Sequence, residues 1–272
     1  MMELLREMLS YPFIVRALTG GLLISLCASL LGVSLVLKRY SMIGDGLSHV
    51  SFGALSVAVA FGWAPLAVSI PVVAAAAVLL LRITGNGKIK SDAAIAMISA
   101  GSLAVGIIVT SLTTGMTTDV SSYMFGSILA MSREDVVLSA VLSLIVLGMF
   151  ILCYNKVFAV TFDESFARAT GVRVSGYNTI LAVLTAVTIV LGMRMMGAML
   201  ISSLIIFPAL TSMRVFKSFS GVILSAGTVS MVCFFIGLVL SYVYSIPAGA
   251  SVVVVNMGAF GIFSVIQAVR RR

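Results

Sequence analysis

The chain consists almost entirely of long apolar runs separated by short polar breaks. A helix needs roughly 20 apolar residues to cross the hydrocarbon of a bilayer. Nine segments fit that length or come close to it, at 13–37, 43–62, 64–81, 92–113, 136–155, 177–193, 197–213, 220–244 and 248–268. A helix satisfies its own backbone hydrogen bonds, whereas lipid cannot hydrogen-bond the backbone of an irregular segment. The pattern therefore predicts an all-α fold, a polytopic transmembrane helical bundle.

The stretch from 177 to 213 leaves the number of spans open. Arg194 and Gly197 interrupt it, and Pro208 falls within its second half. The stretch is read either as a hairpin of two helices or as one broken helix, so the sequence predicts eight or nine spans. No soluble domain or linker is evident, and residues 1–272 are interpreted as a single transmembrane domain.

Composition excludes a soluble protein. Hydrophobic residues make up 61% of the chain and charged residues 10%, whereas about 25% of the residues in a soluble domain are charged. There are too few polar side chains to cover a water-facing surface. Membrane lipid is therefore expected to surround most of the exterior.

The net charge of +8 reflects orientation in the membrane, not nucleic-acid binding. Of the 17 Lys and Arg residues, 13 fall in one alternate set of breaks between apolar runs. Cytoplasmic loops of membrane proteins carry such an excess. This distribution predicts a cytoplasmic C-terminus, cytoplasmic residues 157–176 and, with nine spans, an external N-terminus.

Two breaks are longer than simple turns. Residues 114–135 mix small polar with apolar residues, which suits a short interfacial or re-entrant helix on the external side. In residues 157–176, Asp163 and Glu164 precede a short apolar stretch and Gly171 follows it. Acidic residues at the start and glycine at the end are helix boundary signals. We expect a short amphipathic helix at the cytoplasmic surface.

Asp45 and His49 are the candidate functional residues. His49 is the only histidine in the chain, and Asp45 is the one acidic residue that is read as lying deep in an apolar run. Residues four apart share one face of a helix, and ionisable groups in a span point to function. A carboxylate and an imidazole supply half of a zinc- or manganese-type site. Two copies of the chain would supply four ligands, with Ser41, Ser48 and Ser51 lining the path or bonding the ligands. The competing interpretation is a pair that neutralises itself and fixes helix packing.

Enzyme motifs are missing from the sequence. It contains no GxxxxGK[ST] phosphate loop, no GxSxG, no HExxH and no cysteine cluster. The chain is therefore not expected to be an enzyme. Any energy from ATP would have to come from a separate subunit.

Two segments of the chain resemble the membrane permease subunits of ABC importers for zinc and manganese. In Leu37–His49, a basic turn is followed by a Gly-Asp-x-x-x-His helix start. Further along, an acidic Phe-Asp-Glu loop within Phe162–Gly171 precedes the Gly-Ala…Pro-Ala span of Gly197–Ala209. The order and spacing of these segments agree with the family over nearly the whole chain.

The resemblance implies an ATP-driven importer of divalent transition metals (zinc or manganese, with iron a weaker candidate) in the bacterial cytoplasmic (inner) membrane. It implies a homodimer with cytoplasmic ATP-binding subunits and an extracytoplasmic metal-binding protein, and no permanently bound cofactor. Asp45 and His49 would be the ligands of the metal pathway. The remaining implied site is a coupling helix that docks in the ATPase, carried by Phe162, Asp163, Glu164, Phe166 and Gly171.

An ion-coupled secondary transporter, in which Asp45 and His49 form a proton relay, is the alternative function. It differs from the importer in needing no ATPase partner. A membrane enzyme or scaffold is disfavoured, because the sequence holds no catalytic constellation.

Overall fold

A computed structural model describes residues 6–8, 10–85, 90–113, 126, 128 and 131–270. Within these residues the secondary structure is helical and contains no strand. Most of the external break at 114–135, for which a short helix is expected, lies outside the described residues. The nine long helices are α2 (Pro12–Leu37), α3 (Ile43–Ala60), α4 (Pro65–Gly85), α5 (Ser91–Leu112), α7 (Arg133–Leu152), α10 (Val174–Met196), α11 (Ala198–Val215), α12 (Phe219–Tyr244) and α13 (Ala248–Arg270).

All nine helices are long and apolar enough to cross a membrane. The stretch that left the count open forms two of them, because α10 ends at Met196 and α11 begins at Ala198. Gly197 joins them with a φ of 91°, a conformation that side chains with a Cβ rarely adopt. Pro208 stays inside α11 without ending it. The described part of the chain therefore contains nine candidate spans, within the predicted range.

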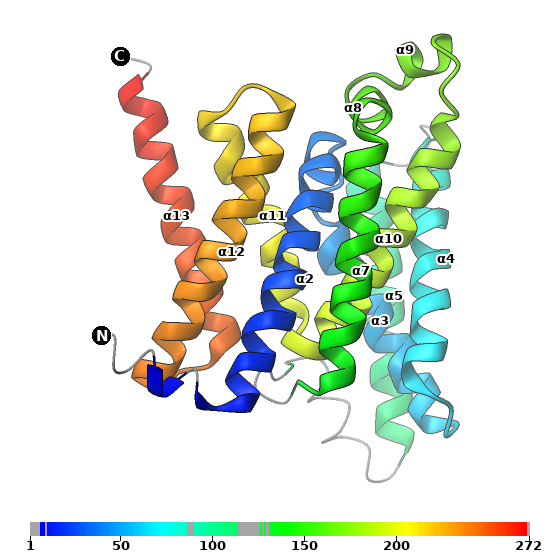
Figure 1. The fold of residues 1–272 in the computed structure, drawn as a ribbon. Helices are drawn as coiled ribbons and strands as arrows, with labels where there is room; N and C mark the ends of the chain where they lie inside the picture. The colour runs from blue at the N-terminus through cyan, green and yellow to red at the C-terminus, as the bar shows by residue number, and fades with distance from the viewer. Residues whose placement is uncertain are drawn as a thin grey trace.

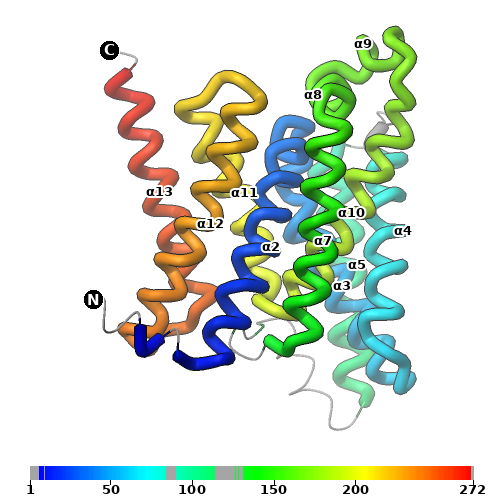
Figure 2. The backbone as a smooth tube through the Cα atoms, viewed as in Figure 1, coloured from blue at the N-terminus to red at the C-terminus, as the bar shows by residue number. Residues whose placement is uncertain are grey.

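The helices stand side by side with their ends at two opposite faces (Figures 1 and 2). Two short helices, α8 (Tyr154–Phe162) and α9 (Glu164–Ala169), lie at the same end of the bundle as the C-terminal end of α13. The start of α2 lies at the opposite end. The distribution of basic residues predicts that the α9 end faces the cytoplasm.

The helices differ in burial, with α2 and α3 at one extreme and α4, α5 and α13 at the other. Most of α2 and α3 is buried inside the bundle, whereas α4, α5 and α13 leave most of their surface exposed. The exposed side chains are largely apolar, for example Leu144 and Leu152 on α7. Such a surface needs lipid around it, and the chain is a multi-pass membrane protein.

One ion pair explains how Arg194 is tolerated next to an apolar span. Its guanidinium lies 3.4 Å from the carboxylate of Asp135, which is almost fully buried at the start of α7. The other carboxylate oxygen of Asp135 accepts from the backbone and hydroxyl of Ser132 in a capping box. The pair joins α7 to α10 at the end opposite α9.

Small residues bring α3 close to α5. A Cβ added to Gly53 would lie 2.5 Å from the carbonyl oxygen of Ser102, and one added to Gly106 would lie 2.7 Å from the ring of Phe52. Membrane helices associate through such close packing, because lipid supplies no hydrophobic drive between them. Glycine at these two positions therefore sets the distance between α3 and α5.

We expect Gly53→Ala to lower the free energy of unfolding by about 1–3 kcal/mol, because the new methyl group meets backbone that cannot rotate away. Chemical denaturation in detergent measures the change. Gly148→Ala is the matched control, since a Cβ there meets nothing within 4 Å. Equal stability of the two variants would contradict the close contact between α3 and α5.

Candidate functional site

Asp45 and His49 occupy successive turns of α3 and lie on one face of it, as their spacing predicts. The Nε2 atom of His49 is 3.7 Å from the Oδ2 atom of Asp45. Asp45 lies in the first turn of the helix, where the positive end of the helix dipole favours a carboxylate. Two potential metal ligands of different chemistry therefore face the same space.

The depth of Asp45 differs from the expectation. The residue was read as lying deep in an apolar run, but it is only the third residue of α3. In Figure 1 the turn between α2 and α3 lies nearer the middle of the bundle than α9 does. The first turn of α3 therefore does not reach the outermost level of the bundle. The expected segment 43–62 and α3 both begin at residue 43, so Asp45 belongs to the first turn of the span and not to its middle.

Exposure distinguishes the pair from an interior packing contact. The Asp45 side chain is 49% exposed and that of His49 is 21% exposed. A pair that only neutralised itself in the core would be sequestered, since burying charge is costly. Here the carboxylate remains open to a ligand or to a second chain.

Neighbouring residues on α3 fix the backbone that carries the pair. Gly44 packs against α11, where an added Cβ would lie 3.1 Å from Ile205, and Gly46 packs against Ile95 of α5. The Ser48 hydroxyl donates to the carbonyl of Gly44 at 2.7 Å, and the buried Ser51 hydroxyl has no hydrogen-bond partner among the described residues. Neither serine bonds Asp45 or His49, in contrast to the ligand-bonding role considered from the sequence.

A single chain provides too few ligands for a closed metal site. No group of three or more His, Cys, Asp or Glu residues comes together within the described part of the chain. Zinc sites are usually four-coordinate. As potential ligands, the Asp45 and His49 side chains would supply two of the four positions of such a set.

The second predicted site forms the link between α8 and α9. Asp163 is the N-cap of α9, and its carboxylate accepts from the backbone of Ser165 at 2.8 Å and of Phe166 at 3.0 Å. Gly171 follows the helix with a φ of 81°, and the amides of Gly171 and Val172 donate to carbonyls of the last turn, as in a Schellman ending. The predicted boundaries of this short helix are confirmed.

The two phenylalanines of this segment have different surroundings. Phe162 is 57% exposed and its ring lies 4.9 Å from that of Phe158 and 5.8 Å from that of Phe219. Phe166 is 60% exposed and makes no ring contact with other described residues. Phe166 is thus an aromatic side chain that projects from the end of the bundle.

Glu164 connects α9 to two long helices. Its carboxylate accepts from Lys38 Nζ at 2.7 Å and from the side-chain amide of Asn178 at 2.9 Å. Lys38 also donates to Asn178 Oδ1 at 2.6 Å. Burial alone would raise the pKa of Glu164, but these two hydrogen bonds and the Lys38 charge outweigh it and lower the pKa below its ordinary value of 4.5.

Sequence reasoning missed Lys38 and Asn178 as members of this site. The Lys38 side chain is only 9% exposed, although the sequence marks it merely as one of several basic residues in a break. Its partner Glu164 is 126 residues away. No local pattern links such distant positions, and the polar triad is visible only in the fold.

The chain is similar to metal-transport proteins over nearly its whole length. It is 28% identical to the high-affinity zinc uptake system membrane protein ZnuB of Haemophilus influenzae, covering 92% of this chain and 96% of that protein. It is 28% identical to the manganese import system permease protein ScaB of Streptococcus gordonii, covering 93% and 91%.

The fold also agrees with a solved structure, PsaBC from Streptococcus pneumoniae in complex with Fab. The TM-score is 0.84 at 28% identity, and the match covers 96% of this chain and 94% of that one. The ABC 3 transport family matches residues 10–267. The chain, with its nine candidate spans and its short helices at one end, is therefore a member of the ABC 3 transport family.

Proposed function

We propose that the chain is the membrane permease of an ATP-driven importer of zinc or manganese, and that two copies form one pathway. The observation that carries this proposal is the Asp45–His49 pair, which is partly exposed on α3 and offers two ligands of the kind these metals bind. Relatives named for zinc and for manganese support the substrate class. The metal is cargo, and we propose no permanently bound cofactor.

A second copy would complete the site. With Asp45 and His49 from each chain, two carboxylates and two imidazoles surround one ion. Such a ligand set replaces the water that a divalent ion loses on entering a narrow path. Coordination requires an ionised Asp45 and a neutral His49.

The proton-relay alternative has less support. The 3.7 Å between Asp45 and His49 exceeds the length of a hydrogen bond. Ser48 donates to the backbone, and Ser51 has no hydrogen-bond partner in the part of the chain that the structure describes. Neither therefore extends the pair into a chain of proton carriers.

The α9 segment is proposed to dock on the ATP-binding subunit. Phe166 supplies an exposed aromatic anchor of the type that dominates protein interfaces, Phe162 widens the apolar surface, and Gly171 ends the helix. Glu164 ties the segment to Lys38, which lies seven residues before Asp45. Movement of α9 in an ATPase cycle would therefore reach the α2–α3 turn directly. The remaining proposed partner is an extracytoplasmic metal-binding protein at the opposite end.

We expect Asp45→Asn and His49→Ala each to abolish metal uptake, because each removes a proposed ligand. Membrane abundance and assembly with the ATPase should persist, because both side chains are partly exposed and their loss leaves no cavity in the core. Uptake of radioactive zinc and manganese by intact cells measures the loss. Asp92→Asn is the control, as this exposed acid lies at the start of α5. Normal uptake by the double variant Asp45→Asn with His49→Gln would contradict the metal-ligand assignment. It would instead favour a pair that neutralises itself and fixes helix packing.

Removing the Phe166 ring should weaken binding of the ATPase and reduce transport. We expect Phe166→Ala to lower that affinity at least tenfold, since an aromatic hot spot contributes about 2 kcal/mol or more and about 1.4 kcal/mol is tenfold in affinity. Co-purification and ATP-dependent uptake measure the effect, with Phe216→Ala, another exposed phenylalanine at this end, as control. If Phe166→Ala binds the ATPase like the parent chain, α9 is not the docking element.

Stability should depend on pH through Glu164. Because the folded-state pKa is lowered, the Lys38–Glu164 pair stabilises the fold above the ordinary pKa of 4.5 and loses this effect as pH falls through the folded-state value. Glu164→Gln should thus be less stable than the parent at pH 7, by no more than about 1 kcal/mol because Glu164 is half exposed.

Thermal unfolding in detergent between pH 7 and the acid limit of folding measures this difference, which we expect to shrink on acidification. Glu134→Gln serves as control, since this exposed carboxylate lies on α7 away from Lys38. A gap between Glu164→Gln and the parent that is constant with pH would show that the carboxylate charge does not stabilise the fold.

A further inference from the structure

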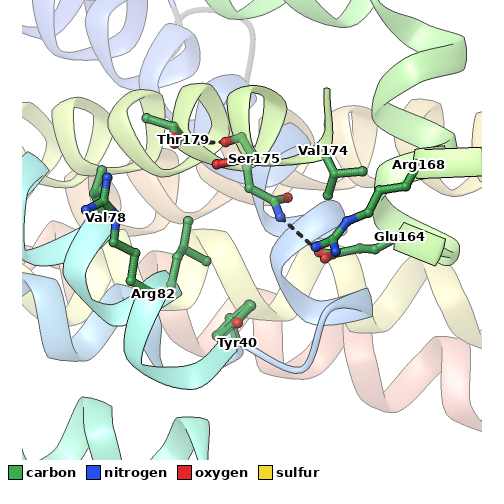
Figure 3. Close-up of a pocket in the computed structure, with 10 residues that line it drawn as sticks. Tyr40, Val78, Arg82, Glu164, Arg168, Val174, Ser175 and Thr179 are labelled. Atoms are coloured by element: carbon green, nitrogen blue, oxygen red, sulfur yellow. Dashed lines mark hydrogen bonds between the residues drawn. The ribbon is translucent and has the colours of Figure 1, made fainter. Parts of the chain in front are cut away.

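A polar cavity of about 460 Å³ opens at the α9 end of the bundle, between α4, α9 and α10 (Figure 3). Arg82 enters it from α4 and Arg168 from α9, with Ser175 of α10 among the residues between them. The volume is in the range of small-molecule sites. Neither arginine belongs to the metal site, and Arg82 lies outside the docking segment. Arg168 lies on α9 but is not among the docking residues named above.

The cavity is lined by two arginines and a single carboxylate, so its walls keep a net positive charge. The Glu164 carboxylate bonds Lys38 and Asn178, and the Arg168 charge also acts on it. Neither the Arg82 nor the Arg168 guanidinium makes a hydrogen bond or ion pair with another side chain in the described residues. Two guanidinium groups, each with several donors in a planar fork, suit a phosphate group.

The surface next to the cavity is suited to an amphipathic ligand. On α4 the exposed residues Val72, Ala75, Leu79 and Arg82 follow one another at helical spacing. They form a single stripe that is apolar along its length and ends in the Arg82 charge. Val78 and Leu81 of the same helix line the cavity itself. A soluble phosphate would make no use of this stripe, whereas the acyl chain of a lipid would lie along it.

We propose that this cavity binds the phosphate-bearing headgroup of an anionic membrane lipid, such as phosphatidylglycerol, with an acyl chain along the exposed stripe of α4. Basic pockets between membrane helices bind such headgroups. Arg82 and Arg168 clamp the phosphate from two sides, and Ser175 donates from between them. The site borders the proposed docking segment through Glu164 and Arg168, but binding of the lipid does not depend on metal transport.

Native mass spectrometry of the purified full chain tests the proposal. The chain is titrated with phosphatidylglycerol, phosphatidylcholine and inorganic phosphate. We expect phosphatidylglycerol to bind and the double variant Arg82→Gln with Arg168→Gln to bind it about thirtyfold more weakly, given the usual contribution of each basic residue near a lipid surface. Arg82→Lys with Arg168→Lys should retain most of the binding. Lys217→Gln should change nothing; this exposed basic residue belongs to the link between α11 and α12, and that link lies at the same end as α9.

Three results would overturn the assignment. Unchanged phosphatidylglycerol binding by the Arg82→Gln, Arg168→Gln variant would exclude the cavity as the site. Inorganic phosphate that binds as tightly as phosphatidylglycerol would show a soluble-anion site. Loss of ATPase assembly with intact lipid binding would assign the two arginines to protein docking. Should the double variant not fold, Arg82→Gln alone is tested, since Arg82 has no side-chain partner within the described residues.

Discussion

Lipid cannot hydrogen-bond a protein backbone, and the arrangement of this chain follows from that constraint. Each span closes its own backbone bonds in a helix, and hydroxyls inside the spans turn to the backbone four residues earlier, as Ser48 and Thr185 do. Helix contacts then depend on close packing, for which Gly53 and Gly106 leave space between α3 and α5. The interior can be apolar because the backbone groups and these hydroxyls are hydrogen-bonded within the helices and do not need water.

The same constraint moves charge to the two ends of the bundle. Arg194 and Asp135 pair at one end, and Lys38 and Glu164 pair at the other. Asp45 and His49 differ from both pairs in distance, since they are separated by 3.7 Å, against 2.7 Å for Lys38–Glu164 and 3.4 Å for Arg194–Asp135. A costly charged group without a firm partner is what an ion pathway requires, and this contrast supports the proposed role of the Asp45–His49 pair.

Local sequence signals predicted a helix well where the apolar run and the boundary residues indicate the same limits. The segment read at 220–244 is the helix Phe219–Tyr244, and the boundary signals at Asp163 and Gly171 mark the two ends of α9. The segment read from residue 136 begins earlier, at Arg133, because Ser132 and Asp135 form a capping box that makes charged residues compatible with the first turn.

Contacts between distant positions could not be predicted in this way. The Lys38–Glu164–Asn178 triad and the arginine cavity each depend on three helices meeting at one end. Hydrophobic periodicity shows which face of a helix is apolar, but it does not show which helices become neighbours. Asp45 and His49 were found because their relation is local, four residues along one helix, whereas the completion of their ligand set by a second chain lies beyond one chain's structure.

The central claim is that two copies of the chain share one ion between their Asp45 and His49 side chains. Metal content of the purified transporter, assembled with ATPase subunits that bind but do not hydrolyse ATP, tests it most directly. After equilibration with zinc or manganese and removal of free metal, elemental analysis should find one ion for every two permease chains in the parent complex, and this ion should be absent from the His49→Ala complex. One ion per permease chain, or equal metal in both complexes, would contradict the account.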